Sequence, residues 1–334
     1  MRRWASRLLA LLFLAAPRPA FGQTYLLIVS GIGGEPRYSA DFFRWSTSLA
    51  EAATARYGLA EENVIVLADS GGPGVTIDGR STKEAVERAV RGIAQRAAPS
   101  ARLFIVLIGH GSASGDEARF NLPGRDMTAH DFAALLEWFP TQEIVFANLS
   151  SASGDFVPIL SGERRVVVTA TKSGFERNQT FFPRFFVDAW VSEGADTDKD
   201  ERVSVLEAFD YARREVARHY ERDNTLQTEH ALLDDNGDGR GSTEPVAEGG
   251  DGALARGVFL DSGPLRAVAA GVAEDTVLIR LYRRREALEN KLAVLRTRKD
   301  AMAPETYERE LERLLVELAT VGRAIREREN REPR

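Results

Sequence analysis

A chain of 334 residues with a formal net charge of −6 is long enough for one sizeable domain plus a smaller one. The mild acidity argues against a general nucleic-acid binder, which would carry a basic surface. The chain contains no cysteine, and this excludes disulfides, thiolate metal sites and a cysteine nucleophile.

The first residues predict a targeting signal that is not part of the fold. Met1–Arg3 is positively charged, the apolar run Leu8–Ala16 follows it, and the small residues Ala20 and Gly22 favour cleavage after Gly22. The apolar run is too short to span a bilayer, and no later stretch is apolar enough for a membrane helix. We therefore expect a signal peptide over residues 1–22 and a secreted or periplasmic protein. An uncleaved membrane anchor is the alternative.

Alternating strand and helix patterns predict an α/β domain over residues 23–265. Short β-rich apolar runs are typical of buried parallel strands, and the segments between them have helical periodicity. Ser81–Glu84 resembles a capping box, Thr128 is a candidate N-cap, and Gly58 fits a C-terminal cap. The alternation predicts a three-layer α/β sandwich with a mostly parallel sheet. The expected strands are 24–30, 62–69, 103–109, 143–146 and 165–170, and the expected helices are 40–56, 81–97, 126–138, 181–190 and 203–220.

From residue 275 the composition changes to mostly Leu, Ala, Glu and Arg. Leucines recur along one face of each half of this segment, and Pro304 suits the first turn of the second half. We therefore expect a helical hairpin with coiled-coil character over residues 275–331. It either packs against the domain or a second copy of the chain, or serves as a partner-binding arm.

Small polar residues follow two of the predicted strands. His110 and Gly111 come after the strand 103–109, and Ser150 and Ser151 come shortly after the strand 143–146. Open α/β sheets place their sites at the carboxyl ends of parallel strands. The sequence therefore predicts that His110 and the serine pair lie side by side at one edge of the sheet.

These strand ends and the order of elements resemble the caspase/legumain superfamily of cysteine peptidases, on its legumain-like side. Ile108–Ser112 (IGHGS) matches the family's His-Gly motif, and Leu149–Gly154 (LSSASG) is similar to the motif that follows its next strand. The similarity covers roughly Tyr25–Trp190, and it implies a caspase/legumain-like fold. Ser151 stands at the position of the family's catalytic Cys.

The serine leaves alternative functions open. Ser151, or Ser150, would be a nucleophile with His110 as its base, and the amides of Gly111 and Ser151 would bind the oxyanion. A serine hydroxyl is harder to ionise than a thiol and needs an oriented base, and no acidic third member can be assigned. The resemblance therefore favours a catalytically impaired pseudo-peptidase that binds a peptide or protein. An active endopeptidase is one alternative, and a calcium-stabilised scaffold acting through its C-terminal hairpin is another.

The resemblance also implies that the loop after residues 165–170 lines a substrate pocket. Lys172 and Arg177 lie in this loop, and Arg37 follows the first predicted strand. All three could serve an acidic ligand. Solvated surface charge is the alternative for each.

Two acidic segments predict calcium sites. Residues 196–207 follow the spacing of an EF-hand loop, with a Glu where the loop usually has Gly at its sixth position. The expected ligands are the side chains of Asp196, Asp198, Asp200, Ser204 and Glu207 and the backbone carbonyl of Arg202. A merely solvated acidic loop is the alternative.

The second segment, residues 234–245, repeats only the opening of such a loop. Asp234, Asn236 and Asp238 are the expected ligands, and Gly239 stands at the sixth position. Position 12 is Pro245, so the bidentate carboxylate is missing. Both segments predict weak calcium binding, in keeping with an exported protein.

Overall fold

The computed structural model describes residues 23–71, 77–115, 117–199, 202–247, 249–261, 276–297 and 302–329. The expected signal peptide over residues 1–22 and the expected calcium ligand Asp200 lie outside these residues. None of the helices within the described ranges combines the length and the apolar character needed to cross a bilayer.

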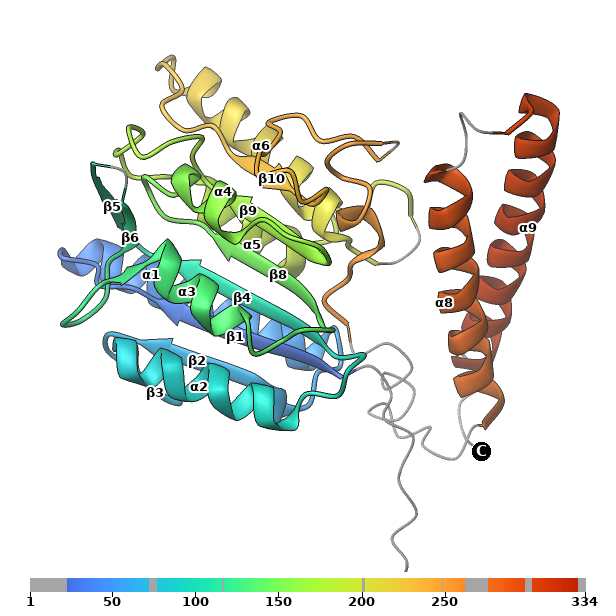
Figure 1. Ribbon diagram of the computed structural model, residues 1–334, viewed down its shortest axis with the longest axis horizontal. Helices are drawn as coiled ribbons and strands as arrows, with labels where there is room; N and C mark the ends of the chain where they lie inside the picture. Colours follow the sequence, from blue (N-terminus) through green and yellow to red (C-terminus); the bar gives the residue numbers. More distant parts are fainter. Residues whose placement is uncertain are drawn as a thin grey trace, which may run out of the picture.

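A seven-stranded sheet forms the centre of the protein, in the order β10-β9-β8-β4-β1-β2-β3 (Figure 1). All its strands are parallel except β10, which pairs antiparallel with β9. The predicted mostly parallel sheet is confirmed, whereas the three-residue strand β10 was not predicted because it is too short to show a periodicity. The strands are β1 (Thr24–Ser30), β2 (Val64–Ala68), β3 (Gly79–Arg80), β4 (Arg102–Ile108), β8 (Glu143–Asn148), β9 (Arg165–Thr169) and β10 (Leu232–Asp234).

Helices cover both faces of the sheet and complete three layers. Alternate residues of each central strand point to opposite faces, so Leu26 packs in one core cluster and Leu27 in the other. One cluster holds α1 (Pro36–Ala55), α5 (Phe182–Val191) and α6 (Val205–Arg222), and the other holds α2 (Lys83–Arg96), α3 (Ala129–Leu136) and α4 (Val157–Leu160). Short 3₁₀ turns add η1 (Glu61–Asn63), η2 (Gly154–Phe156) and η3 (Ala255–Gly257).

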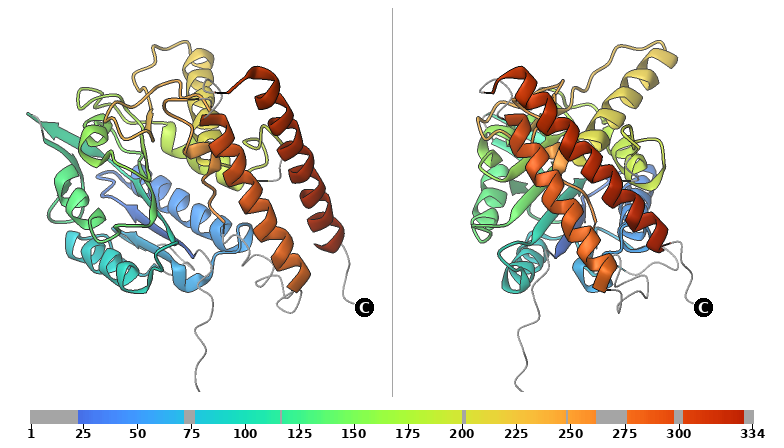
Figure 2. Two further views of the ribbon diagram at one scale, coloured as in Figure 1. Left: turned by 45° about the vertical axis from the view of Figure 1, so that its right-hand side comes forward. Right: turned by 90° about the vertical axis from the view of Figure 1, so that its right-hand side faces the viewer.

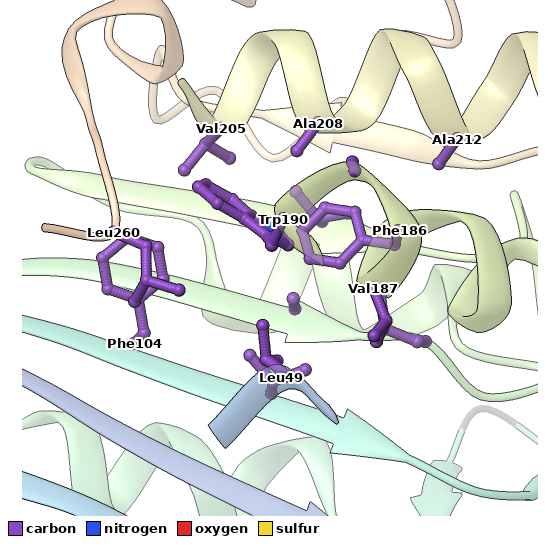
Figure 3. Packing of buried hydrophobic residues seen from close by; sticks show 14 of the residues in the cluster. Leu49, Phe104, Phe186, Val187, Trp190, Val205, Ala208, Ala212 and Leu260 are labelled. Atoms are coloured by element: carbon purple, nitrogen blue, oxygen red, sulfur yellow. The ribbon is translucent and has the colours of Figure 1, made fainter. Parts of the chain in front are cut away.

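The first cluster is the larger of the two cores. Trp190 of α5 lies beneath α6 and above the sheet, with Phe186 beside it and Phe104 of β4 below (Figure 3). The rings of Phe104 and Trp190 meet edge to face at 6.3 Å. α5 therefore packs between α6 and the sheet.

All five predicted helix starts of the α/β domain differ from the structure, by one to four residues. α2 is capped by Thr82, whose side chain accepts a hydrogen bond from the Ala85 amide, whereas Ser81 is buried and does not cap the helix. The predicted box at Ser81 is therefore wrong by one residue. α1 begins at Pro36, four residues before the predicted start, because proline is well suited to the first turn of a helix. The predicted N-cap Thr128 is confirmed, in a capping box with Asp131.

A small antiparallel sheet projects beyond the carboxyl end of β4. It consists of β5 (Gly111–Ser114), β6 (Glu117–Phe120) and β7 (Met127–Thr128), in that order. Two hairpins build this small sheet, one over β5 and β6 and one over β6 and β7 with residues 121–126 between its strands. Its small and polar residues lack the apolar alternation of a buried strand.

The C-terminal segment forms two helices, α8 (Thr276–Thr297) and α9 (Pro304–Glu329), which pack side by side (Figures 1 and 2). Their buried residues form two small clusters that share no member with the cores of the sheet. α8 also contacts η3, the short turn that follows the sheet.

Candidate functional site

The carboxyl ends of four parallel strands meet at one edge of the sheet, here called the carboxyl edge. Ser30 of β1 pairs with Ile108 of β4, and Asn148 of β8 pairs with both Leu107 of β4 and Thr169 of β9. Residues that follow these strands are therefore neighbours. His110 and the serine pair emerge at this edge, and so does the loop that begins at Ala170.

The hydroxyl of Ser151 is bonded to the backbone of Gly111. It accepts a hydrogen bond from the Gly111 amide at 3.2 Å and donates one to the Gly111 carbonyl at 3.1 Å. The His110 carbonyl accepts from the Asn121 amide on the β6 side, so both polar groups of Gly111 point to the unpaired side of β5. Ser151 is only 3% exposed and occupies the position that a neighbouring strand would take.

Gly111 is required for this close approach. A Cβ atom on Gly111 would lie 2.3 Å from the Ser151 carbonyl oxygen and 2.6 Å from the Ser150 hydroxyl. Ser150 itself is fully buried and turned inward, because its hydroxyl donates to Asn148 Oδ1 at 2.7 Å. The turn after β8 is thus closed around β5.

The His110 ring faces α1 rather than the serines. It meets the ring of Tyr38 edge to face at 5.0 Å and that of Phe42 at 5.1 Å. Burial lowers the pKa of His110, against smaller opposite effects of a backbone hydrogen bond at Gly33 and the charge of Glu35. The imidazole is therefore neutral at pH 7. Among the described residues, no hydrogen bond joins the His110 ring to the hydroxyl of Ser150 or Ser151.

The basic residues predicted to bind an acidic ligand each have a partner within the chain. Arg177 donates to the Ala113 carbonyl of β5 at 3.2 Å, next to the Gly111 groups that Ser151 occupies. Lys172 Nζ lies 3.8 Å from a carboxylate oxygen of Glu176. Arg37 Nε lies 3.1 Å from Glu35 on an exposed part of the surface. Arg177 thus helps to cover β5, whereas Lys172 and Arg37 stay accessible to solvent.

A carboxylate–imidazole pair that the sequence did not indicate lies at the same edge. Glu176 Oε1 lies 2.6 Å from His230 Nδ1, and Glu176 Oε2 accepts from the amides of Lys172 and His230. The Glu176 carbonyl in turn accepts from the Ala152 amide, one residue beyond Ser151. The pair spans 54 positions of the chain, so no local motif could have revealed it.

Beside this pair, Phe175 projects into solvent with an exposed fraction of 88%. Gly174 packs against β5, since a Cβ atom there would lie 2.6 Å from the Ala113 side chain. The loop 170–177 therefore holds an unburied aromatic ring over the carboxyl edge.

A buried carboxyl group lies close to the pair. Glu229 accepts hydrogen bonds from the Phe181 and Phe182 amides at the start of α5 and from the Tyr220 hydroxyl. Burial raises the pKa of Glu229 to about 7, although these hydrogen bonds oppose the rise.

The first acidic loop lies at the opposite, amino-terminal edge of the sheet. Oxygens of Asp196, Asp198 and Glu207 lie within 4.8 Å of one another, and they are acceptors that a hard cation prefers. The Glu207 carboxylate also accepts from the Thr197 and Ser204 amides, at 2.9 Å each. Of the other predicted ligands, Ser204 caps α6, and Asp200 is outside the described residues.

Arg202 fastens this loop to the base of the sheet. Its guanidinium lies 2.8 Å from the carboxylate of Asp261 and stacks over the ring of Phe259 at 3.5 Å. The Asp261 carbonyl accepts from the Thr24 hydroxyl at the start of β1. The loop is therefore far along the strands from His110 and Ser151, so a cation bound there would support the fold without touching that pair.

The second acidic loop follows β10 and lies at the same amino-terminal edge. Asp234 pairs with Val167, and Asp234 Oδ1 accepts from the Ser161 hydroxyl at 2.9 Å. Asn236 Oδ1 accepts from the Asp238 amide, which gives the tight turn of a cation-binding loop. Gly239 has φ +74°, as the sixth position of such a loop requires.

The fold defines the class as an α/β protein with a mostly parallel seven-stranded sheet between two helical layers. No family model matches the sequence, and no curated protein matches it. Among solved structures, Raptor from Chaetomium thermophilum is 10% identical with a TM-score of 0.34. That match covers 51% of this chain and 17% of the Raptor chain, and a likeness of this size supports no conclusion about function.

Proposed function

We propose that the protein is an exported, caspase/legumain-like pseudo-peptidase that binds an extended peptide or protein segment at the carboxyl edge and calcium at the opposite edge. One observation carries the proposal, namely that the Ser151 hydroxyl is bonded on both its donor and its acceptor side to Gly111. A nucleophilic serine needs its proton directed at a base.

The surroundings of the pair also disfavour catalysis. The Gly111 amide, which would serve the oxyanion, already donates to Ser151. The His110 imidazole is held against two aromatic rings of α1. Hydrolysis would require the turn after β8 to open and the His110 ring to move, and both changes cost hydrogen bonds or packing.

The exposed surface of the same edge suits a ligand. Phe175 offers an apolar side chain, and Lys172 offers a positive charge beside it. An aromatic ring held over a strand edge is a common anchor in peptide recognition. The proposed ligand is a segment with an apolar residue next to an acidic one.

Calcium is the proposed ion of the first acidic loop. The loop supplies only oxygen donors, and three carboxylates already lie together there. Bound calcium would join the start of α6 to the preceding turn and stabilise the fold through linkage.

Activity-directed labelling tests the catalytic half. The full chain without its signal peptide is treated with a fluorophosphonate probe and with a peptide library, with and without calcium. We expect no labelling and no turnover. Labelling that disappears in Ser151→Ala and His110→Ala but persists in Ser114→Ala would establish the endopeptidase alternative instead. Ser114 is the control because it is an exposed serine on the same small sheet.

Peptide binding tests the other half. A synthetic library of extended peptides is screened against the full chain, and affinities are measured for the best peptide. We expect Phe175→Ser to weaken binding at least about tenfold, the loss of one well-packed anchor. Leu226→Ser, an equally exposed apolar residue on another loop, should leave it unchanged. Equal affinities for all three chains would remove the carboxyl edge as the binding surface.

A second candidate function is a calcium-stabilised scaffold that acts through α8 and α9. Its supporting observation is that Leu315 and Val316, consecutive residues of α9, are both exposed. Deleting residues 275–334 separates the two candidates, since it abolishes partner binding or self-association under the scaffold function and spares peptide binding at the carboxyl edge.

A further inference from the structure

Asp234, at the end of β10, and Asp251, further along the chain, are both buried carboxylates. Asp234 is 0% exposed and Asp251 is 9% exposed. Neither pairs with a Lys, Arg or His among the residues that the structure describes. Buried carboxylates are normally paired with a base or coordinate a metal ion, because an isolated charge loses most of its hydration.

One carboxylate oxygen of Asp234 has no hydrogen-bond donor among the described residues. Oδ1 accepts from Ser161, but Oδ2 is buried and accepts no hydrogen bond from any described residue. A buried carboxylate oxygen without a donor is costly, and an ion would satisfy it. Asp238, four residues further on, is exposed, and its Oδ1 accepts from the Arg240 amide.

A distant segment brings the Asp251 carboxylate to this loop. Asp235, the residue after Asp234, accepts hydrogen bonds from the amides of Gly252, Leu254 and Ala255 at 2.7 to 2.8 Å. These bonds hold the residues just before η3 against the loop. The Asp235 amide donates to Asp251 Oδ1 at 3.2 Å. The Asp251 carboxyl group therefore contacts the residue that follows Asp234 in the chain.

The approach of this segment depends on glycine. Gly252 has φ +104°, and a Cβ atom there would lie 2.8 Å from the carbonyl oxygen of Val246. Gly252 therefore lies close against Val246, and the Val246 amide donates to the Asp251 carbonyl at 2.7 Å.

We propose that the loop after β10 is a second calcium site, which Asp251 completes from outside the loop in place of the carboxylate missing at Pro245. Asp234, Asn236 and Asp238 supply the loop oxygens, and Asp251 supplies the remaining carboxylate. All donors are oxygens, which suits calcium better than zinc or copper. The proposal extends the calcium binding proposed for the first loop and is independent of it.

Calorimetric titration of the full chain with calcium chloride, after removal of bound metal with a chelator, tests the site. We expect two calcium ions per wild-type chain and one per Asp251→Asn chain. Glu244→Gln is the matched control, because it removes one carboxylate next to Pro245 from an exposed side chain. It should retain two ions.

Asp198→Asn separates this site from the first loop. If both sites exist, this variant binds one ion and the double variant with Asp251→Asn binds none. One ion in the wild type that survives in Asp198→Asn and is lost in Asp251→Asn would establish the second site and remove the first. Asp251→Asn with the wild-type number of ions would overturn the proposal, and so would a wild type that binds none. Melting temperatures in chelator, expected to agree within a few degrees, show that the variants fold.

Discussion

The Ser151 hydroxyl pairs with the backbone of β5, as a neighbouring strand would. An edge strand exposes unpaired amides and carbonyls, which proteins cover to prevent unwanted pairing. The Ser151 hydroxyl satisfies both groups of Gly111, and Arg177 satisfies the Ala113 carbonyl two residues further on. Ser151, proposed to stand at a nucleophile position, therefore has a structural role that a catalytic serine could not keep during turnover.

This role predicts the effect of Ser151→Ala. The variant removes the Ser151 partner of the partly buried amide and carbonyl of Gly111, so the free energy of unfolding should fall by about 1–3 kcal/mol. Ser114→Ala, at an exposed site on β5, should change the free energy of unfolding by less than about 0.5 kcal/mol. Urea denaturation measures both. Equal stabilities for the two variants would mean that the hydroxyl contributes nothing to the edge.

The buried Glu229 predicts a pH dependence. Its pKa is about 7 in the fold, against 4.5 in the unfolded chain. Between these values the folded chain holds more protons than the unfolded chain, so stability is full below pH 4.5 and falls as the pH rises to about 7. The loss contributed by this one group is at most about 3 kcal/mol.

Comparison with Glu229→Gln isolates this contribution. The amide keeps a hydrogen-bonding side chain but does not titrate, so the stability of the variant should depend less on pH between about 4.5 and 7. Chemical denaturation at a series of pH values gives the two curves. Parallel curves over this window would show that Glu229 is ionised throughout.

At the scale of elements, two helices begin in the same way but in different surroundings. Thr128 and Asp131 form a capping box at α3, and Ser204 and Glu207 form one at α6. Only the second box belongs to the acidic loop. The Glu207 carboxylate therefore caps a helix and is one of the three carboxylates proposed to hold a cation.

Paired cap variants separate these two roles. In chelator, Thr128→Ala and Ser204→Ala should each lower stability by about 1 kcal/mol through loss of the cap. In millimolar calcium, Thr128→Ala should gain as much melting temperature as the wild type, whereas Ser204→Ala should gain less because a proposed ligand is missing. Thermal unfolding with and without calcium gives all four values. Equal calcium gains in the two variants would exclude Ser204 as a ligand.

At the scale of the whole molecule, the sheet separates two regions. The carboxyl edge carries His110, Ser151 and the exposed Phe175. The amino-terminal edge carries both acidic loops. α8 contacts η3. Ligand binding and cation binding are therefore expected to be thermodynamically independent.

The C-terminal helices should be dispensable for the stability of the sheet. Their buried residues form their own clusters, separate from the two cores. A chain that ends at residue 274 should therefore melt within about 4 °C of the full chain, which corresponds to about 1 kcal/mol for a domain of this size. Differential scanning calorimetry measures the shift. A fall of 10 °C or more would show that α8 and α9 complete the core.

Local patterns were sufficient for the main elements. The strands around Leu103–Ile108 and Arg165–Thr169 and the helix that Thr128 caps follow from periodicity and capping, which depend only on residues close in sequence. The shared edge of His110 and Ser151 follows from the rule that parallel strands end together. Both kinds of inference were within reach of the sequence.

By itself, the sequence determined the α/β class, the chemistry available at the strand ends and the two acidic loops. Only the tertiary structure decided which partners those groups take. The Ser151 hydroxyl binds Gly111, Glu176 binds His230, and Asp251 accepts from the Asp235 amide. The reason is physical: periodicity reports which side of an element is buried, whereas these contacts join segments tens of residues apart and depend on how the packed layers bring them together.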